Sequence, residues 1–492
     1  MGEDVAARTF SREDRQRYRE KLQRCLDVFG RMLRESRFDF ERPLTGLEIE
    51  FNLVDADRDP AMRNEEVLGA IASEVFQAEV GQFNIELNAA PSSLAGTAAD
   101  DLESELRTSL NEAEARAREI GAHIVMIGVL PTLLPEHLSA EALSANPRYA
   151  LMNEQIFAAR GEDLHIEIDG PERLLMYADT IAPEAACTSV QFHLQVSPQE
   201  YASFWNAAQC IAGVQVALGA NSPFLFGKEL WRETRIALFE QATDTRPQEL
   251  KAQGVRPRVW FGERYITSVF DHFEENVRYF SALLPVCDDE DPAAVLDRGD
   301  TPRLSELRMH NGTIWRWNRP VYDIQRGKPH LRIENRVLPA GPTIVDVMAN
   351  GALYYGLLRI LAYQDRPVWS QMSFATAEDN FNEAARRGIH AQVYWPGIGT
   401  VPVTELVLRH LLPLARQGLA EWGVDDSVSD KLLGIIERRC LTHRNGAEWQ
   451  AETFHRLDGE RHMERRDALR EVLGRYVEHM HSNEPVHTWP VG

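Results

Sequence analysis

The stretch LTGLEIEFNLVDAD, residues 44–57, places Glu48 and Glu50 inside an apolar segment that is typical of a β-strand. Successive side chains on a strand point to opposite faces, so the two glutamates share one face and the apolar residues share the other. Same-face neighbours lie about 6.6 to 6.8 Å apart, and at an effective dielectric constant of about 20 two carboxylates repel by roughly 2 kcal/mol. A cation between them would turn this repulsion into attraction. Taken alone, the stretch also fits an exposed strand with two solvated glutamates.

Three later segments repeat the alternation of apolar and polar residues: GQFNIELNAAP (81–91), TSVQFHLQV (188–196) and HLRIENRVL (330–338). If all four strands belong to one sheet, their polar faces form a single wall. That wall carries Glu48, Glu50, Glu86, Gln191, His193, Arg332, Glu334 and Arg336. So many ionisable groups indicate a binding site rather than a structural face.

The residue types on this wall favour a site for metal ions and phosphate. Carboxylates, an imidazole and an amide are oxygen and nitrogen ligands without a thiolate, which suits Mg²⁺ or Mn²⁺ better than structural zinc. Arginine guanidinium groups bind phosphate or carboxylate in bidentate fashion. Metal ions beside arginines therefore predict a nucleotide polyphosphate as the ligand. The loops GxxxxGK[ST] and strand-linked GxGxxG do not occur in the sequence, so the metal ions would have to bind the phosphates.

The composition limits the classes of function. The 492-residue chain has a formal net charge of -22, from 53 basic and 75 acidic residues. This argues against nucleic acid or a membrane surface as a partner, because both require a basic surface. The five cysteines form no CxxC pair, so neither a disulfide framework nor a thiolate zinc site is predicted. The N-terminus is polar, without an apolar signal region, and we expect a soluble cytoplasmic protein.

Hydrophobic spacing predicts an α+β protein in three parts. An amphipathic pattern near the start assigns residues 1–40 to an N-terminal helix. Residues 41–370 mix strands and helices and form the predicted catalytic core, in which a helix is expected over residues 64–76. Residues 371–492 are predicted to form a helical C-terminal region packed on the core.

The order of the motifs resembles that of the glutamate–cysteine ligase type 2 family of carboxylate–amine ligases, in the glutamine-synthetase-like superfamily. The likeness spans about residues 44–363 and includes the ExE strand, ELNAAP, TSVQFHLQV, NSPFLFGKELWRETRIALFEQ and LRIENRVLPAGPTIVDVMANGAL. It implies a curved, mostly antiparallel sheet that forms a glutamine-synthetase-like catalytic funnel, with nucleotide at one end and the amino-acid substrate at the other. Flanking helices and a helical C-terminal region complete the implied fold.

The resemblance also implies roles for individual residues. The family's metal-binding acids match Glu48, Glu50, Glu86 and Glu334. The strand that completes the metal and nucleotide site carries Gln191 and His193, and which of the two is a metal ligand stays open. Arg332, on the same polar wall, is a candidate for nucleotide binding, and a structural ion pair is favoured for it over a catalytic role. The arginines that would hold substrate carboxylate or phosphate, assigned here as catalytic, match Arg235, Arg319 and Arg336.

The implied reaction transfers the γ-phosphoryl group of ATP to a carboxylate, expected to be the γ-carboxylate of glutamate, and an amine then displaces phosphate to leave an amide. ATP as co-substrate and two or three Mg²⁺ or Mn²⁺ ions are implied. The segment NSPFLFGKE (221–229) and a tight turn at Asn311 and Gly312 are the expected lids over the acyl phosphate. The asparagine in IENR and the tryptophan-rich TIWRWNRP depart from well-described glutamate–cysteine ligases, so the acceptor amine is left open. The oligomeric state is also open, with a homodimer as one option.

Two other functions remain as alternatives. A two-metal phosphohydrolase also uses acids clustered on strands, although the acidic chain argues against a nucleic-acid substrate. A non-catalytic nucleotide-binding relative would keep the fold and lose one or more metal ligands, but none of the matched acids is missing here.

Overall fold

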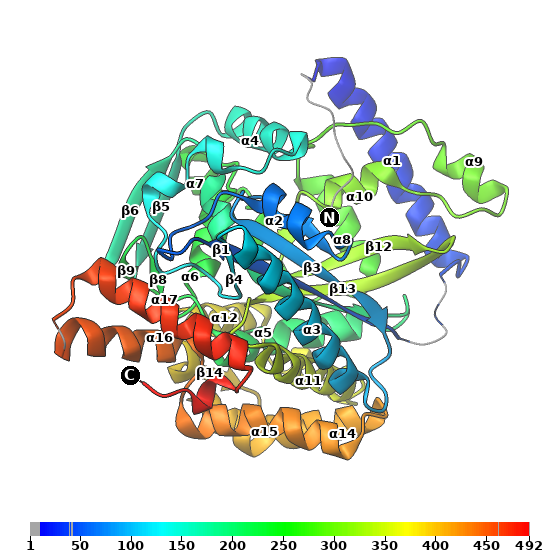
Figure 1. Cartoon of the computed structure of the whole chain (residues 1–492). Helices are drawn as coiled ribbons and strands as arrows, with labels where there is room; N and C mark the ends of the chain where they lie inside the picture. Colours follow the sequence, from blue (N-terminus) through cyan, green and yellow to red (C-terminus); the bar gives the residue numbers. More distant parts are fainter. Residues whose placement is uncertain (1–9, 39, 41–42, 461, 492) are drawn as a thin grey trace.

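A seven-stranded antiparallel sheet lies at the centre of the protein (Figure 1). The computed structural model describes residues 10–38, 40, 43–460 and 462–491. The strand order is β12–β13–β7–β1–β3–β2, and β4 pairs with the end of β1. The strands are β1 (Thr45–Val54), β2 (Phe76–Ala78), β3 (Asn84–Ser92), β4 (His123–Val125), β7 (Ser189–Gln195), β12 (Asn318–Gln325) and β13 (Lys328–Pro339). The predicted α+β fold class with a curved antiparallel sheet is confirmed, and the four motif strands are neighbours in one sheet.

Two long helices, α5 (Tyr201–Gly219) and α11 (Ile344–Leu361), pack against the apolar face of the sheet. Phe192 of β7 contacts Tyr354 and Tyr355 of α11, with ring centroids 6.1 and 5.8 Å apart. Both helices are buried on all sides, which explains why neither has a polar face. Among the described residues, α11 is the one helix whose length and composition would allow it to cross a membrane, and 89% of it is buried inside the protein.

The N-terminal helix α1 (Arg12–Arg34) begins at a capping box formed by Ser11 and Asp14. It packs on α8 (Val269–Tyr279) and α10 (Ser305–Asn311), where the rings of Phe29 and Phe273 lie 4.6 Å apart. The remaining helices of the core are α2 (Asn64–Ile71), α3 (Ala98–Glu119), α4 (Pro147–Arg160), α6 (Thr234–Ala242), α7 (Gln248–Ala252) and α9 (Pro292–Asp297). Short two-stranded sheets pair β5 (Leu164–Asp169) with β6 (Arg173–Ala178), β8 (Phe224–Leu225) with β9 (Lys228–Glu229), and β10 (Val259–Trp260) with β11 (Trp315–Arg316).

The C-terminal region is helical, as predicted, except for one hairpin. Its helices are α12 (Phe374–Arg387), α13 (Val403–Leu406), α14 (Leu412–Glu421), α15 (Asp426–Thr442), α16 (Gly446–His455) and α17 (Arg465–Ser482). The hairpin pairs β14 (Gln392–Trp395) with β15 (Gly399–Pro402). In Figure 1, α14 and α15 lie below α11, on which they pack, and α16 and α17 lie at the lower left.

Three local predictions are corrected by the structure. Asn311 and Gly312 do not form a hairpin turn, because Asn311 is the last residue of α10 and Gly312 caps it; the β12–β13 turn is made by Arg326 and Gly327, both with positive φ. The helix expected over residues 64–76 ends at Ile71, where Ala72 adopts a left-handed conformation. The segment 221–229, expected to be a lid, is anchored in the core by buried hydrogen bonds of Asn221.

The segment 221–229 is tied into the core rather than hinged over the site. Asn221 is fully buried and donates hydrogen bonds to the Ala340 carbonyl and the Tyr476 hydroxyl, each 2.7 Å long. Glu233 accepts from the Asn221 backbone N–H and from the Ser222 hydroxyl. Because these buried polar groups satisfy one another, opening the segment would break several hydrogen bonds at once.

A close contact between α11 and α14 gives a stability prediction. A Cβ atom added at Gly418 would lie 1.9 Å from the backbone oxygen of Gly356, and backbone cannot move aside cheaply. We expect Gly418→Ala to lower the free energy of unfolding by about 1–3 kcal/mol or more, as overpacked cores do. The matched control is Gly434→Ala in α15, where a Cβ would meet only the end of the Arg438 side chain at 3.5 Å. Urea unfolding of both variants measures the difference, and an equal response of the two would contradict this packing.

Candidate active site

The register of the sheet places the charged side chains of four strands in rows. Glu50 of β1 lies opposite Glu86 of β3, and Glu48 lies opposite Gln191 of β7. In the next row, Glu334 of β13 lies between His193 of β7 and Arg319 of β12. Directly opposed residues on antiparallel strands have Cβ atoms about 4.5–5.5 Å apart, so each row is a set of interacting neighbours. The strand pairing therefore brings the predicted metal acids onto one wall.

Glu334 is held between two arginines. Arg319 donates from Nε and Nη2 to the two carboxylate oxygens of Glu334 at 3.0 and 2.9 Å, and Arg336 Nη1 donates to Oε1 at 2.8 Å. Burial disfavours the charged carboxylate, but Arg319 and Arg336 outweigh that effect and hold the pKa of Glu334 well below its usual range. Glu334 is therefore an anion at neutral pH.

A hydrogen-bonded chain continues from Arg336 across the sheet. Arg336 Nη1 also donates to Gln191 Oε1 at 2.6 Å, and Gln191 Nε2 donates to Glu50 Oε1 at 3.0 Å. The backbone N–H of Ser189 donates to the other oxygen of Glu50 at 2.6 Å. Arg319, Glu334, Arg336, Gln191 and Glu50 thus form one continuous network through β12, β13, β7 and β1.

The second predicted acid of the ExE strand has a different partner. Glu48 Oε1 lies 3.2 Å from His193 Nε2, although this nitrogen makes no well-aligned hydrogen bond. Burial opposes ionisation of Glu48, yet the attraction of His193 prevails and lowers the pKa of Glu48 to about 2. Arg332 Nε donates to His193 Nδ1 at 3.1 Å, and Arg332 Nη1 pairs with Asp323 at 3.0 Å. Arg332 therefore makes a structural ion pair, as favoured from the sequence, and it also orients His193.

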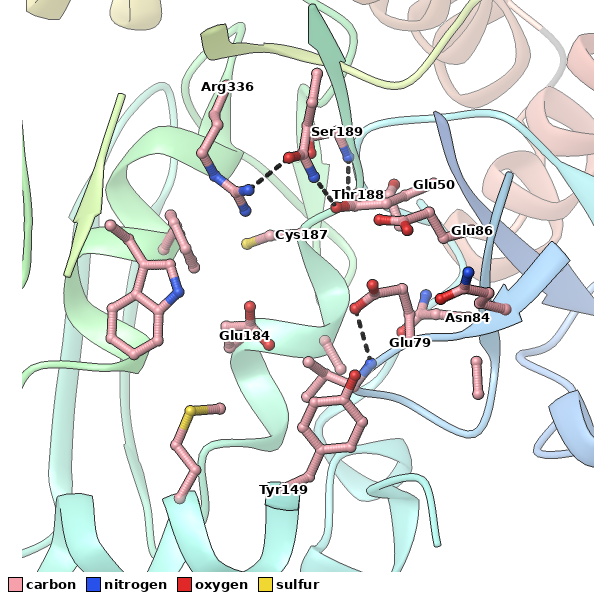
Figure 2. Close-up of a pocket in the computed structure, with 18 of the residues that line it drawn as sticks. Glu50, Glu79, Asn84, Glu86, Tyr149, Glu184, Cys187, Thr188, Ser189 and Arg336 are labelled. Carbon is pink, nitrogen blue, oxygen red and sulfur yellow. Dashed lines mark hydrogen bonds between the residues drawn. The ribbon is translucent and has the colours of Figure 1, made fainter. Parts of the chain in front are cut away.

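Two adjoining cavities lie along this wall. The acidic cavity has a volume of about 290 Å³ and contains four glutamates, Glu50, Glu79, Glu86 and Glu184 (Figure 2). Its lining also includes Tyr149, Cys187, Trp317, Arg235, Arg319 and Arg336. The mixed-charge cavity, about 360 Å³, is lined by charged groups and by Phe273, Val321 and Tyr322; the charged groups include Glu48, Asp323, Arg332 and Glu334. Arg148, Gly312 and Arg319 line both cavities, so the two spaces meet there.

The carboxyl groups of the acidic cavity resist ionisation. Burial, with Glu86 adding repulsion and Arg336 opposing, raises the pKa of Glu50 to about 7. Burial and the charge of Glu50 raise the pKa of Glu79 to about 7 and that of Glu184 to about 8. The pKa of Glu86 is well above its ordinary value, through burial and then Glu79. Groups that resist ionisation in this way would ionise readily beside a divalent cation.

The donor set fits Mg²⁺ or Mn²⁺ in chemical type. Within the described ranges, no three histidine, cysteine, aspartate or glutamate side chains already stand close enough together to hold a metal ion. The predicted ligands instead form two groups, Glu50 with Glu86 in the acidic cavity and Glu48 with Glu334 in the mixed-charge cavity. Mg²⁺ prefers oxygen ligands such as these. A bound cation would also lower the raised pKa values of Glu50 and Glu86.

Arg235 lies at the edge of this arrangement. It is 2% exposed, and its Nη2 donates to the Val337 carbonyl at 2.6 Å while its Nε donates to Glu233 at 3.2 Å. Its guanidinium carbon also lies 5.4 Å from the centre of the Trp317 ring. Arg235 lines the acidic cavity, but most of its donors are already used by the protein. These contacts favour a structural role for Arg235, in which it holds Trp317 and the Val337 backbone in place.

Sequence reasoning missed Glu79 and Glu184. Glu79 follows the three-residue edge strand β2, and Glu184 lies in a short 3₁₀ turn, Ala182–Ala186, before β7. Neither belongs to a long alternating segment, so the two-residue period that revealed the other acids gave no signal. The available signal was a single acid in an apolar setting, QAEVG and IAPEAAC.

Comparisons with known proteins agree with this architecture. The model of glutamate–cysteine ligase family 2 (GCS2) matches residues 44–472. No curated protein matches the sequence. A crystal structure of glutamate–cysteine ligase from Francisella tularensis in complex with AMP has a TM-score of 0.56 and 12% identity, and the alignment covers 93% of this chain and 91% of that chain.

Two further solved structures are more distant. A bifunctional glutathione synthetase from Pasteurella multocida has a TM-score of 0.47 and 13% identity over 93% of this chain and 55% of that chain. The ligase PafA, in its complex with the prokaryotic ubiquitin-like protein Pup, has a TM-score of 0.36 and 9% identity over 88% of this chain and 72% of that chain. The family match extends over the whole sheet and most of the C-terminal helices, and the chain therefore belongs to glutamate–cysteine ligase family 2.

Proposed function

We propose that this protein is an ATP- and Mg²⁺-dependent carboxylate–amine ligase that forms a γ-glutamyl amide through an acyl phosphate. Family membership supports the ligase class. The observation that carries the proposal is the position of the network from Arg319 to Glu50, which runs along both cavities and presents two arginines and two acids to them. Such a network suits the meeting of two anions, a triphosphate and a carboxylate.

The two cavities suit different ligands. The mixed-charge cavity combines Arg332 with Phe273 and Tyr322, which gives cationic contacts for phosphates and apolar surface for a base. The acidic cavity, with Arg336 and the acid groups, is the place for the amino-acid substrate and the amine. The shared residue Arg319 marks the point where phosphoryl transfer would occur.

Glu48, Glu50, Glu86 and Glu334, completed by Gln191 or His193, would hold the metal ions. When bound, these ions would supply positive charge that offsets the triphosphate and polarises the transferred phosphoryl group.

The side chains of this chain contribute by position and charge. Arg319 and Arg336 are oriented by Glu334, so their guanidinium groups are fixed before substrate binds and lose little freedom on binding. Gln191 fixes Arg336 from the other side. The buried wall of β7 and β13 excludes water from the place where a hydrolysable acyl phosphate would form.

An assay of ADP release tests this function. The protein is incubated with ATP, Mg²⁺, L-glutamate and a panel of amines, and we expect ADP and an amide detected by mass spectrometry only when both glutamate and an amine are present. Omission of either substrate should reduce ADP release to background. Phosphate release without an acceptor, or hydrolysis of a phosphoester without ATP, would instead favour a phosphohydrolase.

A further inference from the structure

One acid in the acidic cavity differs from the others. Glu184 projects from the 3₁₀ turn Ala182–Ala186 and, like Glu79, is not on a strand, but Glu79 accepts a hydrogen bond from the Val80 backbone N–H at 3.1 Å. Its carboxylate points into the space bounded by Cys187, Arg336 and Tyr149 (Figure 2). Its Oε2 atom is buried and has no hydrogen-bond partner among the described residues. A buried oxygen without a partner is costly, more so when charged, unless a ligand satisfies it.

The sheet acids are already bonded by the protein. Glu50 accepts from the Ser189 backbone N–H and from Gln191, and Glu86 accepts from Asn88 at 2.7 Å. The lining of the cavity that contains Glu184 also includes the apolar side chains Met152, Phe239 and Trp317. A buried carboxyl oxygen without a partner, in a cavity of about 290 Å³ that also has apolar lining, is complementary to a small organic ammonium ion.

We propose that Glu184 binds the ammonium group of the acceptor amine and takes one of its protons, so that this end of the cavity accepts compact cationic amines. This proposal rests on the function proposed above. An alkylammonium ion has no lone pair and cannot attack a carbonyl carbon, so a base is needed at this point. The acidic cavity also contains Arg319 and Arg336, which places the amine beside the carboxylate that is activated.

The step balances in atoms and charge. The ammonium gives one proton to the Glu184 carboxylate, and the free amine attacks the acyl carbon and forms the C–N bond. The C–O bond to phosphate then breaks, and phosphate leaves with the electron pair. The second proton of the attacking nitrogen goes to the leaving phosphate, which departs as hydrogen phosphate. Glu184 returns its proton to solvent when the product leaves.

The charges around Glu184 suit this role. The titratable and charged groups that act on it or respond to it are Glu50, Glu79, Tyr149, Cys187 and Arg336. Burial and Glu50 together raise the pKa of Glu184 to about 8, although Arg336 opposes them. In the empty cavity such a pKa leaves Glu184 mainly protonated near pH 7, and a bound ammonium ion favours its ionised form. The resulting carboxylate is closer in proton affinity to an alkylamine, and so a stronger base, than an exposed glutamate.

The test uses two kinds of nucleophile. Hydroxylamine is largely neutral at pH 7, so it can trap an acyl phosphate as a hydroxamate without a base, whereas methylamine, 1,2-diaminoethane and L-cysteine are largely protonated. Wild-type protein with ATP, Mg²⁺ and glutamate should form the hydroxamate and should transfer the glutamyl group to at least one of these three amines.

We expect Glu184→Gln to keep hydroxamate formation within about 3-fold and to lower amide formation on the order of 10²-fold, with partial recovery as pH rises. Glu184→Asp should fall between the two, and Glu136→Gln, an exposed glutamate in the turn Pro135–His137, is the matched control.

Each result has one meaning. No hydroxamate from wild-type protein would refute the proposed function itself. Hydroxamate without transfer to any of the three amines would overturn the assignment of a compact cationic acceptor. Equal loss of both reactions in Glu184→Gln, with a higher Mg²⁺ requirement, would make Glu184 a metal ligand instead. Unchanged amide formation in Glu184→Gln would remove it from the reaction.

Discussion

Glu334→Gln is expected to reduce ATP-dependent amide formation by at least about 10³-fold and to destabilise the fold by about 3–5 kcal/mol. Glu334 accepts three hydrogen bonds from Arg319 and Arg336, and glutamine would keep one acceptor oxygen but turn an NH₂ group toward a guanidinium group. Two partly buried cations would then lack their shared anion, and the same change removes a carboxylate from the proposed metal site. Turnover, circular dichroism and urea unfolding of the purified variant measure the two effects separately.

Glu50→Gln serves as the matched variant. It removes one acid from the same network, but Glu50, unlike Glu334, does not lie between two arginines. The pKa of Glu50 is raised to about 7, so glutamine resembles the protonated form that already exists near neutral pH. We expect activity to fall by a similar factor, since a neutral amide neutralises a cation poorly, while stability changes by only about 1 kcal/mol for the hydrogen bond from Ser189 or Gln191 that is lost. If both variants fold and remain active, the site has been placed wrongly.

The strands and the polar wall could be predicted from the sequence because alternation is a local signal. Glu48 and Glu50 share a face whatever pairs with them, and the same holds for Glu334 and Arg336. The register is not local: that Glu50 opposes Glu86, and Glu334 opposes His193, depends on which strands pair and where their turns lie.

The errors have equally specific causes. Asn–Gly favours a hairpin turn, but asparagine and glycine also end helices, and here they end α10. Arg319 could be assigned only through the family resemblance, since its segment WNRP shows little alternation. Glu79 and Glu184 reach the acidic cavity from the end of a three-residue strand and from a short turn, and only the folded chain shows that they point the same way.

The acidic cavity should make stability depend jointly on pH and on Mg²⁺. Glu50, Glu79 and Glu184 have an ordinary pKa of 4.5, and in the folded protein their pKa values are raised to about 7, 7 and 8. The folded state therefore binds more protons than the unfolded state above pH 4.5, and without divalent ions the free energy of unfolding should fall as pH rises through 7 to 8. Each carboxyl group that is protonated only in the folded state contributes about 1 kcal/mol per pH unit.

Mg²⁺ should reverse this loss, because a cation bound among these carboxylates favours their ionised form and stabilises only the folded state. The two buffers are compared at each pH from 6.5 to 8. The buried histidines His272, His310 and His330 have lowered pKa values and add stability until about pH 7.5, but they do so equally with and without Mg²⁺. The melting temperature in EDTA should fall by several degrees across this window, and it should stay nearly constant in Mg²⁺ at matched ionic strength. In Glu50→Gln the fall in EDTA should be smaller, because one of the titrating groups is gone. A melting temperature with the same pH dependence in EDTA and in Mg²⁺ would show that the carboxylates of the acidic cavity do not bind the ion, whatever the enzyme's metal requirement in turnover.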